Sequence, residues 1–241
     1  MIKTQKTPIL FLDFDGTISK RDVTDVILEQ YANEAWQAAE TAWLDGRIGS
    51  RACLSEQMSL VQATRSQLHA LLDAIEIDEG LSTLLDLCNA CNVAAHIISD
   101  GFDYCITRIL ARGVNGQRST IKSICASHLE LSKLPWRTEF PFFRQSCAHG
   151  CATCKPAVMR LLNPKNAPVI FVGDGFSDRY AVECADLVFA KNDLARYCAD
   201  NSIEHIAYTT LSEVATRMEA WMLARTFRRD EEMRDDLPIS V

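Results

Sequence analysis

Two apolar runs of the 241-residue chain are each followed by a pair of aspartates. Asp13 and Asp15 come directly after the first run, and Asp174 and Asp178 follow the run 169–173. Carboxylates gathered at one place repel each other and hold protons at neutral pH unless a cation lies among them. Hard oxygen ligands of this kind suit Mg²⁺. The spacing therefore predicts a magnesium site, provided that the two runs end side by side.

Hydroxyl groups and a lysine add residues that can bind an anion. Ser99, Asp100 and Gly101 follow another apolar run, Thr17 stands beside the first acidic pair, and Lys155 opens a predicted helix. A cation at the positive N-terminal end of a helix is unfavourable unless an anion binds there. A phosphate held by the lysine, the hydroxyls and backbone N–H groups would compensate the charge of the lysine and the positive end of the helix. Together with the carboxylates, these residues predict a phosphoryl-transfer site.

The elements that must position these residues form an alternating pattern of strands and helices. The apolar and β-branched runs predict buried strands at 9–13, 93–99, 169–173 and 187–190, with 203–208 as a further candidate. Apolar periodicity predicts helices at 104–111, 156–162, 176–184 and 211–226. This order is typical of a doubly wound, Rossmann-like α/β fold with a parallel sheet, which binds ligands at the carboxyl ends of its strands.

The spacing between the first two strands is too long for a simple strand–helix–strand unit, which needs about 30 residues. Residues 20–92 instead show helical periodicity and predict a helical cap inserted after the first strand. The expected α/β core is then 1–19 and 93–227, with a charged, flexible tail at 228–241. Within the core, we expect residues 114–154 to form extended segments or a hairpin.

Composition limits the classes of protein to which the chain can belong. The net charge of −7 and the pI near 5.3 argue against a general nucleic-acid surface, which requires basic stripes. Apolar runs are too short for a bilayer span or a signal peptide. We therefore expect a cytoplasmic protein without membrane partners, whose ten cysteines are thiols. The sequence does not predict the oligomeric state.

The motifs in this order resemble those of the haloacid dehalogenase superfamily of phosphohydrolases: Asp-x-Asp-Gly-Thr, a serine at a strand end, a lysine, and Gly-Asp-x-x-x-Asp. The resemblance implies that Asp13 is a nucleophile forming an aspartyl-phosphate and that Asp15 is the general acid and base. It also implies that Mg²⁺ is held by Asp13, the carbonyl of Asp15 and Asp174, with Asp178 in support. Ser99 and Lys155 would bind the phosphate.

The helical insert and "CATCKPAVMRLL" narrow the resemblance to the branch of phosphoserine phosphatases. Within it, the chain is most similar to the methionine-salvage phosphatases of 2-hydroxy-3-keto-5-methylthiopentenyl 1-phosphate. Asp22 stands where phosphoserine phosphatases carry a carboxylate that contacts the substrate. Arg47 and Arg51 in the insert could face the site and contact the leaving group, or could be solvated like most charged residues on helices.

Three closely spaced cysteines form a second candidate site. Cys147, Cys151 and Cys154 surround His149, a spacing that suits structural Zn²⁺, and Cys125 or His128 could complete the ligands. Free thiols in a loop next to the phosphate site are the alternative, since a second paired cysteine motif is missing.

The function expected from these features is Mg²⁺-dependent hydrolysis of a small phosphorylated metabolite through an aspartyl-phosphate. A phosphomutase or phosphotransferase would use the same core and deliver the phosphoryl group to a hydroxyl of a sugar. A non-catalytic binding protein would keep the fold and lose the nucleophile or the metal ligands. The presence of Asp13, Asp15, Lys155 and Asp174 favours an enzyme.

Overall fold

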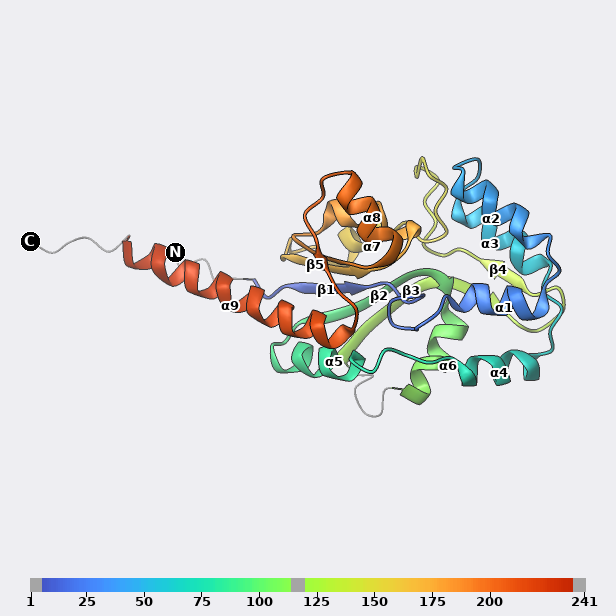
Figure 1. Ribbon diagram of the computed structural model, residues 1–241, viewed down its shortest axis with the longest axis horizontal. Helices are drawn as coiled ribbons and strands as arrows, with labels where there is room; N and C mark the ends of the chain where they lie inside the picture. The colour runs from blue at the N-terminus through green and yellow to red at the C-terminus, as the bar shows by residue number, and fades with distance from the viewer. Residues whose placement is uncertain (1–5, 114–119, 236–241) are drawn as a thin grey trace, which may run out of the picture.

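The described residues, 6–113 and 120–235 with side chains up to residue 225, form a seven-stranded sheet covered by helices (Figure 1). The strands are β1 Ile9–Leu12, β2 Ala94–Phe102, β3 Ile121–Glu130, β4 Arg137–Glu139, β5 Val169–Gly173, β6 Leu187–Ala190 and β7 Ile206–Ala207. They lie in the order β4-β3-β2-β1-β5-β6-β7, and only the β3–β4 pair is antiparallel. The expected doubly wound α/β fold is confirmed.

Strand β1 is apolar at every position because both of its faces are covered. Leu10 and Leu12 belong to the apolar cluster on one side of the sheet, and Ile9 and Phe11 belong to the cluster on the other side. Successive side chains of a strand point to opposite faces, so a strand buried on both faces has no polar alternation. The central position of β1 in the sheet follows from this composition.

Helices cover both faces of the sheet (Figure 1). The helices α7 Lys155–Leu162 and α8 Asn192–Asp200 lie on one face. The helices α5 Leu81–Ala90, α6 Asp103–Gly113 and α9 Leu211–Asp235 lie on the other. Helix α9 continues through the first part of the expected charged tail, and residues 236–241 of that tail lie outside the described residues.

The insert after β1 contains the helices α1 Val23–Tyr31, α2 Trp36–Leu44, α3 Ser50–Ser59 and α4 Arg65–Ala74. Its two ends meet, because Ser19 and Ile77 form an antiparallel bridge. The backbone N–H of Lys20 donates to Glu76 O (2.9 Å), and that of Asp78 donates to Ile18 O (2.8 Å). Helix α5, expected within the cap, packs against α9 and β2 on the face of the sheet. The chain thus leaves and re-enters the core through one short two-stranded connection.

Two predicted segments differ in detail from the structure. Residues 176–184 form two short 3₁₀ turns, Phe176–Asp178 and Val182–Cys184, rather than one helix. The carboxylate of Asp178 accepts the N–H groups of Asp174 and Gly175, and such local side-chain bonds compete with helix formation. The segment 114–154 contains the β3–β4 hairpin, as predicted; residues 114–119 lie outside the described residues.

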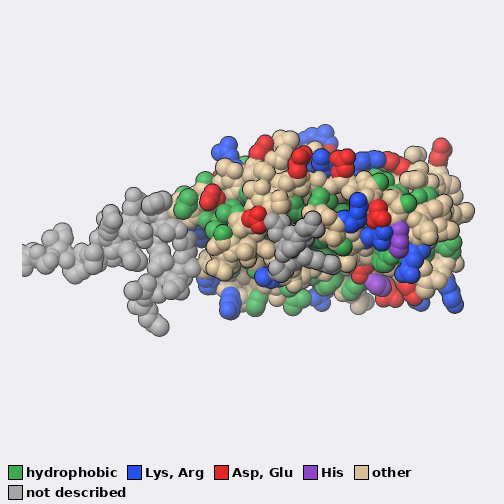
Figure 2. Space-filling model, turned by 90° about the horizontal axis from the view of Figure 1, so that it is seen from below, with side chains coloured by type: hydrophobic (Ala, Val, Ile, Leu, Met, Phe, Trp, Pro, Cys, Tyr) green, Lys and Arg blue, Asp and Glu red, His purple; other side chains and the backbone are tan. Residues whose placement is uncertain are grey.

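Acidic and basic side chains are mixed on the surface. On the face drawn in Figure 2, Lys and Arg side chains are interspersed with Asp and Glu, and they do not form a continuous stripe. Within the described part of the chain, no helix is long and apolar enough to cross a bilayer.

Candidate active site

The chemically reactive side chains gather at the carboxyl ends of β1, β2 and β5. The strand register places Leu12 opposite both Ile97 and Val172. The backbone N–H of Asp13 donates to Val172 O at 2.9 Å, which holds the end of β1 against β5. The residues that follow these strands therefore meet at one edge of the sheet, as expected for an open parallel sheet.

Lys155, the first residue of α7, lies at the base of this site. Its Nζ donates to Asp13 Oδ1 (2.8 Å) and Asp178 Oδ1 (2.5 Å), and all three side chains are buried. Burial alone would lower the pKa of Lys155, but attraction to Asp13, Asp178 and Asp100 outweighs it and raises that pKa. The lysine is therefore a permanent cation in a buried position.

One lysine does not balance the carboxylates around it. Burial and repulsion from Asp178 raise the pKa of Asp13 well above its usual value, although Lys155 opposes the shift. The same two causes raise the pKa of Asp174 to about 6. A site with excess negative charge of this kind is one that a divalent cation would stabilise.

The oxygen atoms of this site have the chemistry and spacing that a hard cation needs. One carboxylate oxygen each from Asp13, Asp174 and Asp178 lies within 4.8 Å of the others. All three are hard oxygen donors, which fit Mg²⁺ better than a soft metal.

Asp15 is held by two donors next to Asp13. Its Oδ1 accepts the backbone N–H of Val23 (2.9 Å), and its Oδ2 accepts the hydroxyl of Ser99 (3.3 Å). Burial, followed by repulsion from Asp22, raises the pKa of Asp15 well above its ordinary value. The carboxyl group therefore retains its proton more readily than an exposed aspartate and can donate it.

Two glycines allow this close packing of side chains. A Cβ at Gly101 would lie 2.2 Å from Asp15 Oδ2, and a Cβ at Gly16 would lie 2.2 Å from Asp174 Oδ2. Gly16 also has φ +69°, which any other residue adopts only with strain. The backbone at both positions must approach a carboxylate of a neighbouring strand, and only glycine leaves room for it.

Two residues expected near the phosphate have protein partners. The hydroxyl of Thr17 donates to Asp174 Oδ1 (3.3 Å). The carboxylate of Asp100 accepts the hydroxyl of Ser50, from the start of α3, and the N–H of Thr153 (2.8 Å). Asp100 thus connects the insert to the core, and its side chain is directed to these donors.

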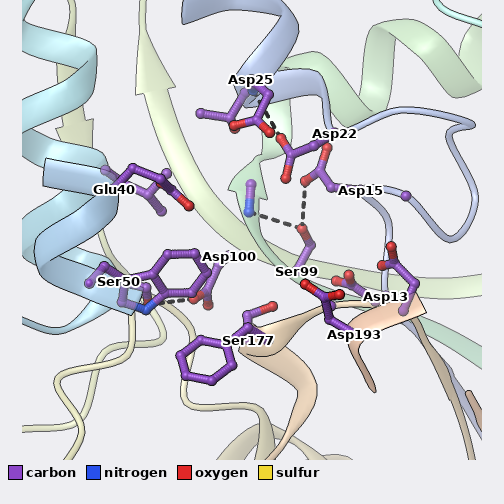
Figure 3. Close-up of a pocket in the computed structure, with 18 of the residues that line it drawn as sticks. Asp13, Asp15, Asp22, Asp25, Glu40, Ser50, Ser99, Asp100, Ser177 and Asp193 are labelled. Carbon is purple, nitrogen blue, oxygen red and sulfur yellow. Dashed lines mark hydrogen bonds between the residues drawn. The ribbon is translucent and has the colours of Figure 1, made fainter. Parts of the chain in front are cut away.

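A cavity of about 410 Å³ lies between this site and the insert. Figure 3 shows carboxylates from both parts around it. Asp22 lines the cavity and caps α1 by accepting the N–H of Asp25 (3.0 Å). Arg47 and Arg51 do not line it: Arg47 pairs with Asp45 (3.1 Å), and the guanidinium of Arg51 lies 4.1 Å from the ring centre of Phe143.

The sequence analysis did not identify Asp25 and Glu40, which line the same cavity. Burial, then repulsion from Asp22 and Glu40, raises the pKa of Asp25 to about 7. Burial also raises the pKa of Glu40. Asp25 stands on α1 near the charged residues Arg21, Asp22 and Glu29, so it carried no sequence signal. Glu40 is the one charged residue of the apolar helix α2, and this was the signal that could have identified it.

The zinc prediction for Cys147, Cys151 and Cys154 is not supported. Among the described residues, the ligand atoms of these cysteines do not gather as those of the aspartates do. The imidazole of His149 stacks on the ring of Tyr180, with ring centres 3.8 Å apart. The two residues proposed to complete the site also have other partners, Ser123 for Cys125 and Asp103 for His128. The three cysteines are free thiols.

Comparison with known proteins gives the family. The model of the haloacid dehalogenase-like hydrolases matches residues 10–183, from β1 through the turns that carry Asp174 and Asp178. The chain belongs to this family of hydrolases. The resemblance deduced from the four motifs is thereby confirmed, and the haloacid dehalogenase family accounts for the order in which they occur.

Curated relatives cover nearly the whole chain. The 2-hydroxy-3-keto-5-methylthiopentenyl-1-phosphate phosphatase of Bacillus pumilus is 26% identical over 230 residues, 92% of this chain and 97% of the relative. The enzyme of the same name from Geobacillus thermodenitrificans is 25% identical over 218 residues, 89% and 97% of the two chains.

Two solved structures of phosphoserine phosphatases share the fold. One is the structure of a phospho-aspartyl intermediate analogue of phosphoserine phosphatase. It superposes with a TM-score of 0.69 at 15% identity, covering 88% of this chain and 99% of that one. A substrate-bound phosphoserine phosphatase gives a TM-score of 0.69 at 17% identity, with 89% and 99% covered. At these identities the comparison establishes the architecture alone.

Proposed function

We propose that the chain is a Mg²⁺-dependent phosphatase that hydrolyses a small phosphomonoester through a phosphoryl group carried on Asp13. The observation that carries this proposal is the position of Lys155, whose buried amine lies between Asp13 and Asp178 beside a cavity. The relatives from Bacillus pumilus and Geobacillus thermodenitrificans are both named as phosphatases, which supports the same reaction class.

The first step would be attack by a carboxylate oxygen of Asp13 on phosphorus, with cleavage of the bond between phosphorus and the ester oxygen. Asp15 would give its proton to that oxygen, and the alcohol would leave. The raised pKa of Asp15 supports this role, because the acid must be protonated when the reaction begins.

In the second step, Asp15 would remove a proton from water. The water oxygen would attack the phosphoryl group on Asp13, releasing inorganic phosphate and restoring the carboxylate. The insert, which lies over the cavity, would limit the access of bulk water to the reacting groups during both steps. Each step uses the same pair of residues in opposite protonation states.

Phosphate oxygens would be held by hydrogen-bond donors around Asp13 and Asp15. The amine of Lys155 can transfer a hydrogen bond from Asp13 to a phosphate oxygen, and the Ser99 hydroxyl and the N–H of Gly101 lie at the end of β2. Mg²⁺ would be held by Asp13, Asp174 and Asp178, with the carbonyl of Asp15. When bound, it would neutralise charge on the transferring phosphoryl group.

A test of this function measures free phosphate released from a panel of phosphomonoesters by the purified protein. We expect release with Mg²⁺, none after chelation with EDTA, and a loss of roughly 1,000-fold or more in Asp13→Asn. The exposed Asp200→Asn is the matched control and should retain full activity. Full activity in Asp13→Asn would refute the proposed nucleophile.

The same assay distinguishes a phosphatase from a phosphotransferase. With an excess of a sugar alcohol as acceptor, a phosphatase still releases one phosphate for each ester consumed. A phosphotransferase or phosphomutase would instead yield a new phosphorylated sugar with little free phosphate. The 2-hydroxy-3-keto-5-methylthiopentenyl ester named for the relatives belongs in the panel.

A further inference from the structure

The side of the cavity formed by the insert carries three carboxylates: Asp22, Asp25 and Glu40. We propose that the leaving group of the substrate carries a positive charge, so that the enzyme hydrolyses small phosphomonoesters of amino alcohols. The inference rests on the proposed function, because it takes the phosphate to be held beside Lys155 and the remainder of the substrate to extend toward the insert. Figure 3 shows Glu40 and Asp25 on the side of the insert, away from Asp13, and Asp22 next to Asp15.

The three carboxylates interact with one another, and the basic group that acts on both Asp22 and Asp25, Arg21, pairs instead with Glu29. No described residue forms an ion pair with any of them, and the carboxylate of Asp25 has no hydrogen-bond donor among the described residues. Their mutual repulsion contributes to the pKa of Asp25, about 7, after burial itself. Desolvation of the Asp22 carboxylate also raises its pKa, although backbone N–H groups, Lys155 and Arg21 oppose the shift. A cation from the substrate would relieve this repulsion.

The cavity lining includes two basic residues, Lys20 and Arg21, and both form ion pairs with glutamates. Lys20 pairs with Glu76 (3.3 Å) and Glu79 (3.5 Å), and Arg21 pairs with Glu29 (2.8 Å). Neither arginine that could have contacted an acidic leaving group, Arg47 or Arg51, lines the cavity. A substrate with a second acidic group would therefore meet three carboxylates, and the cations beside them, Lys20 and Arg21, already pair with glutamates. Such an arrangement discriminates against anionic leaving groups.

Glu40 is held in place by two uncharged partners, which do not neutralise its carboxylate. Its Oε2 accepts the amide of Gln57 at 2.9 Å, and the thiol of Cys53 lies 3.7 Å away. Trp43 is three residues further along α2, so it lies on the same face of the helix and also lines the cavity. Trp43 meets Phe176 of the core edge to face, with ring centres 5.6 Å apart. Carboxylates beside an aromatic ring suit an ammonium group.

The test compares substrates of the same shape and different charge. O-phosphoethanolamine and n-propyl phosphate differ by replacement of an ammonium with a methyl group, and phosphoglycolate supplies a carboxylate of similar size. Phosphocholine and 3,3-dimethylbutyl phosphate form a second pair with a quaternary centre. With Mg²⁺, we expect kcat/KM to be at least roughly tenfold higher for the cationic member of one pair. Neutral or anionic esters that are hydrolysed as well as the cationic member in both pairs would overturn the inference.

Variants then assign the preference to the carboxylates. Asp25→Asn and Glu40→Gln keep side-chain size, and the glutamine retains an acceptor for Gln57. Each should reduce the ratio of cationic to neutral kcat/KM by roughly tenfold, mainly through a higher KM for the cationic ester. Glu34→Gln, an exposed residue of the insert outside the cavity, is the control. An unchanged ratio in both cavity variants would contradict the assignment.

Binding separates this inference from the proposed function. Calorimetry with Asp13→Asn and Mg²⁺ uses the same pairs of esters without turnover. Tighter binding of the cationic ester supports the inference even if the wild-type protein releases no phosphate, which would refute the proposed function alone. Equal or weaker binding of the cationic ester overturns the inference even if other phosphomonoesters are hydrolysed.

Discussion

At the scale of single residues, the site depends on a lysine that is 2% exposed. A lysine is almost never buried to this degree unless it is paired, and Lys155 is paired with both Asp13 and Asp178. The two carboxylates in turn need the lysine, because a buried charge without a partner costs several kcal/mol. Without a bound cation, Lys155 therefore maintains the fold around the site, and in the proposed function it would also bind phosphate.

Replacing Lys155 by methionine should show both roles. In EDTA, Lys155→Met leaves two buried carboxylates uncompensated, and we expect the free energy of unfolding to fall by about 3 kcal/mol. Urea unfolding at pH 7 measures this change. Mg²⁺ should restore part of the stability, since it would bind the folded state, but phosphate release should remain abolished.

The exposed Lys133→Met is the matched control for this experiment and should unfold like the wild-type protein. An equally stable Lys155→Met protein in EDTA would mean that the lysine does not compensate the carboxylates.

At the scale of elements, one serine connects the insert to the core. Ser50, at the start of α3, donates its hydroxyl to Asp100 of β2 and accepts the N–H of Ala152 (2.9 Å). The insert approaches the core closely here, since a Cβ at Gly49 would lie 2.3 Å from Gly150 O. This contact and the two-stranded connection at Ser19 and Ile77 hold the insert over the cavity.

Ser50→Ala should loosen that contact. The substitution leaves Asp100 Oδ2 and the N–H of Ala152 without these partners, a cost of about 1–3 kcal/mol. We expect amide hydrogen exchange to accelerate by roughly tenfold in peptides covering 50–59 and 147–154, while the strands of the sheet keep their protection. Ser59→Ala, whose exposed hydroxyl bonds within its own turn, should exchange like the wild type. Unchanged exchange in Ser50→Ala would show that the hydroxyl does not hold the insert.

Strand β2 also contains a histidine whose burial makes stability depend on pH. His96 stacks on Phe11 with ring centres 5.5 Å apart, and its Nδ1 lies 2.7 Å from Ser123 Oγ. Burial, followed by repulsion from Lys122, lowers the pKa of His96 below its ordinary value of 6.5. The unfolded chain then binds a proton more readily than the folded chain, so this histidine destabilises the fold as the pH falls below about 6.5.

His96→Gln should remove this contribution. Between pH 7.5 and 5.5, the free energy of unfolding should fall further in the wild type than in the variant, as measured by urea unfolding at both pH values. Using the difference between the two proteins cancels the titration of the active-site carboxylates, whose raised pKa values act in the opposite direction. The same pH dependence in both proteins would exclude His96 as its source.

At the scale of the whole molecule, the parts that the sequence predicted are those fixed by local pattern. The buried strands are continuous apolar runs, and the parallel order then brings Asp13, Ser99 and Asp174 to one edge. The positions of Arg47 and Arg51 depend on how the insert packs on the core, which helical periodicity does not determine. The missed residues Asp25 and Glu40 belong to the same class: α1 and α2 were predicted, but the faces that line the cavity follow from tertiary packing.

The short 3₁₀ turns in place of a helix at 176–184 have a similar cause. The apolar residues of this segment have the spacing of a helix, but the carboxylate of Asp178 bonds back to Asp174 and Gly175. The requirement of the site therefore overrides local propensity, which is expected where function constrains the backbone.

The most direct test of the account is to trap the phosphoryl group on the protein. Wild-type protein turning over a phosphomonoester with Mg²⁺ is quenched in acid within milliseconds, digested and examined by peptide mass spectrometry. We predict a peptide containing Asp13 that is heavier by one phosphoryl group, and its absence in Asp13→Asn. Steady hydrolysis with no phosphoryl group on that peptide, or with the group on another residue, would contradict the account.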